Sequence, residues 1–137
     1  MLDDIANTYY SELLSGIQVI AGKNNYVCTF YSRASNNKAE NDYLNLFIEG
    51  QIDGLIMGTF HTRTPESVNA IAESAYPIVL VGDNAGNRNI DSVDVDNEQG
   101  TIDEVQYLYS LGHRQIAYLR GPKDMSGANY RAEGFIK

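Results

Sequence analysis

Short apolar runs alternate with segments of helical periodicity along this chain, and that alternation limits the fold more than any other feature. Residues 55–57 and 78–81 are compact apolar runs, and segments with an apolar residue every three or four positions lie around them. Strands that alternate with helices predict a parallel sheet with right-handed helical crossovers. We therefore expect an α/β fold in which helices flank a parallel sheet.

The stretch 93–135 shows the alternation most clearly, because its pattern predicts a strand, a helix, a second strand, a loop and a second helix in turn. Asp96 and Gln99 have the spacing of a capping box before a helix over 101–110. Gly112 follows the last apolar position of that helix and suits the left-handed conformation in which many helices end. The sequence therefore predicts both ends of this helix.

The other elements are predicted from the same kinds of pattern. Helices are expected from Tyr10 to residue 21, over 43–48, and from Pro65, which suits the first helical position, to residue 75. Apolar and β-branched runs predict strands at 26–31, 55–57, 78–81, 93–97 and 116–119.

The composition excludes several classes of function. The 137 residues have a formal net charge of −8, which opposes binding of a nucleic-acid backbone by this segment alone. Cys28 is the only cysteine, so no internal disulfide forms. No apolar run approaches the length of a membrane-spanning helix. A cytoplasmic protein is the simplest expectation.

Polar loops follow several of the predicted strands. In open parallel sheets, ligands bind in the crevice beyond the carboxyl ends of the strands. That rule places the loops 32–37, 58–62, 83–85 and 96–97 on one rim of the molecule. Asp83, in one of these loops, is a candidate polar contact for a ligand.

Tyr9 and Tyr10 open the first predicted helix. In one interpretation both are ordinary aromatic residues of a helix start, with one of them buried. In the other, one of the two offers a flat ring on which the C–H face of a sugar or a planar base stacks. The sequence leaves both interpretations open.

Asp96 and Arg131 are the strongest polar candidates. Asp96 begins a helix, so it caps that helix, accepts hydrogen bonds from ligand hydroxyls, or does both. The planar guanidinium of Arg131 suits two neighbouring oxygens, such as a vicinal diol or a carboxylate. The alternative for Arg131 is a solvent-exposed helix arginine.

Nothing in the sequence assembles into a catalytic or metal-binding motif. His61 and His113 are far apart and lack the spacing of metal ligands. The chain has no Gly-x-Ser-x-Gly nucleophile elbow and no phosphate-binding P-loop. We expect no enzymatic activity, no metal and no cofactor.

An ordered set of short motifs resembles a known family. The motifs are Asn-Thr-Tyr-Tyr at 7–10, Val-Asp-Asn at 95–97, Leu-Gly-His-Arg-Gln-Ile-Ala at 111–117, Gly-Pro at 121–122 and Arg-Ala-Glu-Gly-Phe at 131–135. In this order they resemble the effector-binding core of the LacI/GalR transcriptional regulators, over nearly the whole chain. The resemblance implies a lobe of the periplasmic-binding-protein-like type I fold.

The resemblance also implies a domain boundary and a set of site residues. Residues 1–97 would be the first lobe without its first strand, and residues 98–137 would be the truncated start of the second lobe. Such a piece is expected to be unstable or to complete its sheet from another chain. The ligand-binding residues that the resemblance implies are Tyr9, Tyr10, Asp96, Arg131 and Gln99. Asp83, the polar candidate on the same rim, completes the predicted set of six.

The implied function is effector binding and dimerisation in a transcriptional repressor. A small molecule, a sugar or a purine, would bind between the two lobes of the effector-binding core. Two such chains would pair as a homodimer. Operator DNA would be contacted only by a headpiece absent from these residues, and no membrane would be involved. The alternative is a sugar-binding protein of an ABC-type transport system, which shares the fold.

Overall fold

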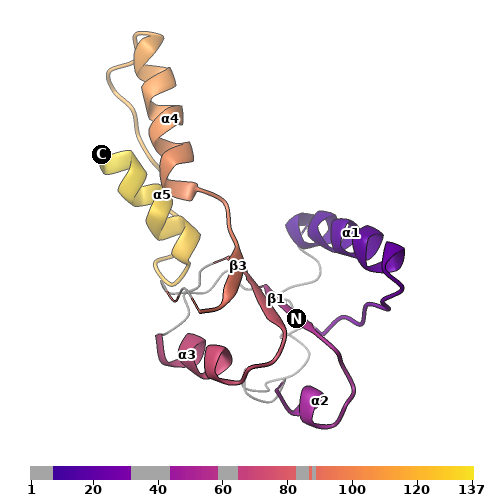
Figure 1. Ribbon diagram of the computed structural model, residues 1–137. Helices are drawn as coiled ribbons and strands as arrows, with labels where there is room; N and C mark the ends of the chain where they lie inside the picture. Colours follow the sequence, from indigo (N-terminus) through magenta and orange to yellow (C-terminus); the bar gives the residue numbers. More distant parts are fainter. Residues whose placement is uncertain (1–7, 32–43, 59–64, 83–86, 88) are drawn as a thin grey trace.

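The computed structural model describes residues 8–31, 44–58, 65–82, 87 and 89–137 (Figure 1). In that view the strands lie at the centre, with α2 and α3 below them, α1 to one side and α4 and α5 above. No helix in this part of the chain is long and apolar enough to cross a membrane. The elements in chain order are α1 (Thr8–Lys23), α2 (Leu44–Ile48), β1 (Leu55–Gly58), α3 (Pro65–Glu73), β2 (Ile78–Val81), β3 (Asp91–Val93), α4 (Asn97–Ser110) and α5 (Ser126–Ile136).

Within the described residues, three strands form a parallel sheet in the order β1-β2-β3. Leu55 pairs with Ile78 at the start of the first ladder, and Val79 pairs with Asp91 at the start of the second. The chain crosses from β1 to β2 through α3, because parallel strands need a long connection. The predicted α/β fold with a parallel sheet and flanking helices is confirmed.

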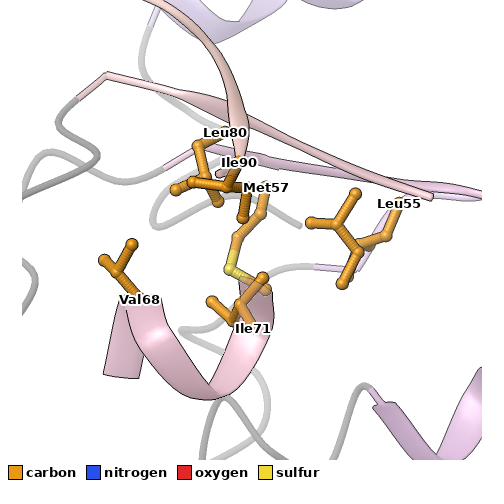
Figure 2. Packing of buried hydrophobic residues seen from close by; sticks show 7 residues of the cluster. Leu55, Met57, Val68, Ile71, Leu80 and Ile90 are labelled. Carbon is orange, nitrogen blue, oxygen red and sulfur yellow. The ribbon is translucent and has the colours of Figure 1, made fainter. Parts of the chain in front are cut away.

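The apolar core lies between the sheet and α3 (Figure 2). Val68 and Ile71 lie on the face of α3 that is turned toward Met57 of β1 and Leu80 of β2. Full burial of each such side chain contributes about 1.5–3 kcal/mol, so this cluster is the main source of stability for the sheet. The buried cluster comprises Leu55, Met57, Val68, Ile71, Ile78, Leu80 and Ile90.

Helix α4 ends where the sequence predicts. Gly112 has a φ of 96°, in the left-handed region that favours glycine. Its N–H donates to the carbonyl of Tyr109 at 3.0 Å, and the N–H of His113 donates to the carbonyl of Leu108 at 3.2 Å. These two hydrogen bonds form the Schellman arrangement, which satisfies carbonyl groups at the end of the helix.

Residues 26–31 do not form the strand that their composition predicts. A strand needs a hydrogen-bonded neighbour about 4.8 Å away. Instead, this stretch shares the walls of a cavity of about 960 Å³ with α1 and β1. Val27 is 94% exposed, and within the described residues the stretch joins no ladder. A β-rich composition was therefore not sufficient for a strand.

The strand predicted at 93–97 lies earlier in the chain than expected. Strand β3 covers Asp91–Val93 rather than 93–97. The carboxylate of Asp94 accepts a hydrogen bond from the N–H of Val95 at 2.7 Å. A side chain that bonds to the adjacent backbone in this way competes with a β-ladder, so the chain leaves the sheet before α4 begins.

Helices α4 and α5 form a pair that stands away from the sheet (Figure 1). Contacts between elements concentrate within this pair and within the sheet. The connection between the two helices includes residues 116–119, which do not form the predicted strand. Leu119 is 98% exposed, because this connection runs beside α4 and does not reach the strands of the described sheet.

Candidate ligand-binding site

The N-terminus of α4 begins at a polar cap. Asp96 is the N-cap, and its Oδ1 accepts a hydrogen bond from the N–H of Gln99 at 3.0 Å. The side-chain amide of Gln99 donates to Asp103 at 2.7 Å, so in the described residues the reciprocal bond of a capping box is not formed. Asp96 is exposed, and its second carboxylate oxygen is therefore accessible to a ligand hydroxyl.

Arg131 lies on α5 and reaches across to the first residue of α4. Its Nη1 donates a hydrogen bond to Oδ1 of Asn97 at 2.6 Å. Arg131 is exposed, and in the part of the chain that the structure describes Asn97 is its one hydrogen-bonding partner. The remaining N–H groups of the guanidinium, which carries five N–H donors in all, are therefore accessible to a ligand.

Close packing of α5 on α4 keeps Arg131 beside the cap. A Cβ at Gly134 would overlap the backbone carbonyl oxygen of Glu98, so glycine is required for this approach. Lys137 forms an ion pair with Glu98, and the hydrogen bond and charge of that carboxylate raise the pKa of Lys137. Glycine at position 134 thus allows the two helices to pack closely.

The site therefore combines three kinds of polar group. The N-terminus of α4 carries partial positive charge, which favours oxygen acceptors. The guanidinium of Arg131 adds a full positive charge and several donors, and the carboxylate of Asp96 supplies an acceptor. Such a set can hold a ligand whose oxygen atoms both accept and donate hydrogen bonds, as neighbouring hydroxyl groups do.

Tyr9 and Tyr10 lie at the start of α1, which is apart from the α4–α5 pair in Figure 1. Their rings meet edge to face, with centroids 5.6 Å apart and planes inclined by 70°. Tyr10 is only 1% exposed, whereas Tyr9 is 45% exposed. Tyr9 is thus the member of the pair whose ring is accessible, and the buried ring of Tyr10 packs against it.

The structure says less about the two remaining candidates, Asp83 and Gln99. Asp83 lies outside the described residues. Gln99 is exposed on the first turn of α4. Among the described residues, no three His, Cys, Asp or Glu side chains are positioned to hold a metal ion. The ligand-binding roles of all six predicted residues stay predictions.

Asn97 was missing from the predicted set, although it joins α4 to Arg131. The sequence placed Asn97 in the loop 96–97 on the rim of the sheet, without assigning a role to its side chain. Its partner lies 34 residues further along the chain, and local patterns carry no signal for a contact between two helices at that separation. The motif Val-Asp-Asn at 95–97 contains Asn97, but it does not indicate which side chain contacts Arg131.

The cavity of about 960 Å³ is a separate feature. Its walls come mainly from apolar residues of α1, residues 26–31 and the first two strands. Among the described residues that line it, none belongs to α4 or α5. The candidate site is therefore an exposed polar surface beside α4, and it is distinct from this apolar space.

The parallel sheet and the polar helix start beyond it define an α/β ligand-binding lobe. All residues, 1–137, match the family described as periplasmic binding proteins and sugar binding domain of the LacI family. The chain belongs to this family. The resemblance predicted from the sequence motifs is thereby confirmed.

Similar proteins include regulators of transcription. The HTH-type transcriptional repressor CytR of Escherichia coli (strain K12) is 29% identical over 138 residues, which cover 100% of this chain and 40% of the repressor. A putative ribose operon repressor from Burkholderia thailandensis has the same fold, with a TM-score of 0.80, 24% identity, and coverage of 98% of this chain and 51% of that one. The complex of the transcriptional regulator CelR with cellobiose gives a TM-score of 0.71 and 26% identity, covering 93% of this chain and 39% of that one.

Proposed function

We propose that this chain is the effector-binding and dimerisation part of a LacI-type transcriptional regulator. In this proposal it senses a small polyhydroxylated molecule, a sugar, between two lobes. The observation that carries the proposal is the guanidinium of Arg131, which is bound to α4 through Asn97 and keeps its other donors exposed beside the cap residue Asp96.

The ligand contacts follow from the chemistry of the site. Arg131 donates hydrogen bonds to ligand oxygens, and Asp96 accepts a hydrogen bond from a ligand hydroxyl. Tyr9 provides a ring against which an apolar ligand face stacks, with Tyr10 packed behind it. Gln99 and Asp83 contribute weaker polar contacts.

A sugar is favoured over a purine as the ligand. The family description names a sugar-binding domain, and CelR is a regulator whose structure contains cellobiose. A carboxylate beside a guanidinium also suits neighbouring hydroxyl groups. A purine is the second ligand class, because a planar base could stack on the exposed ring of Tyr9.

Regulation would follow from closure of two lobes around the ligand. Residues 94–96 connect the sheet to α4, and a change in this connection would shift the balance between two lobe arrangements. The proposed partners are a second copy of the chain and operator DNA contacted by a separate headpiece, in the cytoplasm. A transport-system binding protein is the alternative function, since the same family description includes periplasmic binding proteins.

Ligand binding can be measured by NMR titration of the chain with mono- and disaccharides, and with nucleobases as the second class. We expect a sugar to shift the amide signals of Asp96 and Gln99. A hydrogen bond to a charged group contributes about 1.5–3 kcal/mol, so Arg131→Ala should raise the Kd about ten- to a hundredfold. The Kd of Arg131→Lys should lie between that of the unaltered chain and that of Arg131→Ala, because lysine keeps the positive charge but lacks the planar guanidinium group.

Arg114→Ala is the matched control for this experiment. Arg114 sits at the opposite end of α4, where it donates to the carbonyl of Tyr109 at 2.8 Å. Its replacement should leave the Kd unchanged. The proposal is wrong if a sugar binds equally well to Arg131→Ala and to the unaltered chain, or if no sugar shifts any signal of the α4–α5 pair.

A further inference from the structure

The side chain of Asn97 connects two parts of the chain through its two polar atoms. Its Oδ1 accepts the 2.6 Å hydrogen bond from Nη1 of Arg131. Its Nδ2 donates to the carbonyl of Val95 at 3.0 Å, and its backbone N–H donates to the same carbonyl at 2.8 Å. The amide is thus held at the nitrogen end, and its oxygen end is directed to the arginine.

The surroundings keep this amide and the guanidinium in place. A Cβ added at Gly127 would lie 3.5 Å from Nη1 of Arg131 and 3.5 Å from Nδ2 of Asn97, so the backbone of α5 packs against both groups. Asn97 is also partly buried. The close approach of α5 at Gly134 fixes the distance that the arginine side chain has to span.

An arginine side chain has several rotatable bonds, and binding a ligand with it costs the freedom of those bonds. A contact that restricts the side chain before the ligand arrives reduces that cost. Asn97 uses only one of the donor groups of Arg131, Nη1, so the contact restricts the guanidinium without consuming its other donors.

We propose that Asn97 is a positioning residue for Arg131: its amide oxygen holds Nη1, and the remaining donors are thereby presented to the ligand. This inference rests on the proposed function, in which Arg131 binds the ligand. It assigns to Asn97 an effect on affinity that acts through the arginine and requires no contact between Asn97 and the ligand.

The positioning is tested first without ligand, by nitrogen NMR of the arginine side chains. A guanidinium held by an acceptor rotates slowly about its Nε–Cζ bond and gives separate Nη signals. We expect separate signals for Arg131 in the unaltered chain, assigned by their loss in Arg131→Lys. Asn97→Ala should merge them, and Asn97→Asp, which keeps an acceptor oxygen, should preserve them.

Affinity provides the second readout, through a double-mutant cycle. In the background that retains Arg131, Asn97→Ala should raise the Kd for the sugar about tenfold, because it removes a hydrogen bond to a charged group. In the Arg131→Ala background the same substitution should change the Kd little, because the group it positions is gone. Asn97→Asp should retain most of the affinity.

Asn129→Ala is the matched control, since Asn129 also lies on α5 and accepts a hydrogen bond from an arginine, Arg120, at 2.5 Å. It should alter neither the Arg131 signals nor the Kd.

The inference is overturned if Asn97→Ala leaves the Arg131 signals separate, or if it weakens binding equally in both backgrounds. If no sugar binds to any variant, the proposed function fails, while the ligand-free spectra still decide whether Asn97 positions Arg131. Should Asn97→Ala fail to fold, merged signals in a folded Asn97→Asp chain would contradict the inference.

Discussion

The sheet with α3 and the α4–α5 pair are held together by different kinds of contact. Between the sheet and α3, seven apolar residues form one buried cluster, and Met57, Val68 and Leu80 have no exposed surface (Figure 2). Between α4 and α5, the buried residues are small, as Thr101 and Gly134 show. The first region relies on apolar burial, and the second relies on a close backbone approach with polar contacts around it.

This difference explains where a polar ligand site is possible. A buried cluster leaves little room for groups that must meet a ligand, because burying an unpaired polar group is costly. The α4–α5 pair instead keeps Asp96 and Arg131 exposed while holding them beside each other through Asn97. The sheet supplies stability, and the helical pair supplies the chemistry of the candidate site.

The largest expected effect tests the sheet. Leu80→Ala removes a fully buried side chain from the centre of the cluster, and such changes lower the free energy of unfolding by about 2–5 kcal/mol. Leu119→Ala is the same substitution at a site that is 98% exposed, and it should change stability by less than about 0.5 kcal/mol. Urea denaturation followed by circular dichroism measures both.

Hydrogen exchange then sharpens the comparison between the regions. In Leu80→Ala the amides of β2 should lose protection first, whereas amides in the middle of α4 should keep theirs, because contacts concentrate within each region. Equal loss of protection in β2 and α4 would show that the two regions unfold as one unit.

The second prediction tests the helical pair. In Gly134→Ala the new methyl group clashes with the backbone carbonyl of Glu98. A backbone group cannot turn aside as a side chain can, so α5 has to move away from α4. Overpacking of this kind costs about 1–3 kcal/mol. We expect a lower thermal midpoint and weaker separate signals from Arg131, because its distance to Asn97 increases.

Gly100→Ala is the control for this prediction, since Gly100 is also a helix glycine, on α4. Nothing lies within 4 Å of a Cβ at this position. Alanine is favoured over glycine in a helix by about 0.5–1 kcal/mol, so Gly100→Ala should be stabilising. If both substitutions change stability in the same direction, the close approach of the two helices is not what holds the pair together.

The same contrast between regions shows how far sequence reasoning reaches. Strands β1 and β2 were predicted from compact apolar runs, and Gly112 marked the end of α4, because these features depend on a few adjacent residues. Residues 26–31 and 116–119 have similar compositions but form no strand. Whether an apolar run becomes a strand depends on a neighbour elsewhere in the chain, which local composition does not reveal.

The candidate site divides in a similar way. Asp96 was identifiable as a cap from its place before an amphipathic segment, and Arg131 was identifiable as a candidate from the chemistry of its side chain. The contact between Asn97 and Arg131 was not predictable, because it depends on how α5 crosses α4. Local sequence patterns thus identified Asp96 and Arg131 as candidates. The role of Asn97 between them depends on tertiary packing.

The smallest of these effects concerns the cap itself. Asp96→Ala removes the acceptor of the 3.0 Å hydrogen bond from the N–H of Gln99, and loss of an N-cap costs about 0.5–2 kcal/mol. Asp96→Asn should retain most of the stability, because asparagine is an equally good cap. Glu104→Ala, an exposed change on the same helix, is the control and should be close to neutral. Urea denaturation without ligand, together with exchange of the Gln99 amide, measures the cap apart from any ligand contact. A loss in Asp96→Ala no greater than in Glu104→Ala would mean that packing by α5, and not the cap, fixes the start of α4.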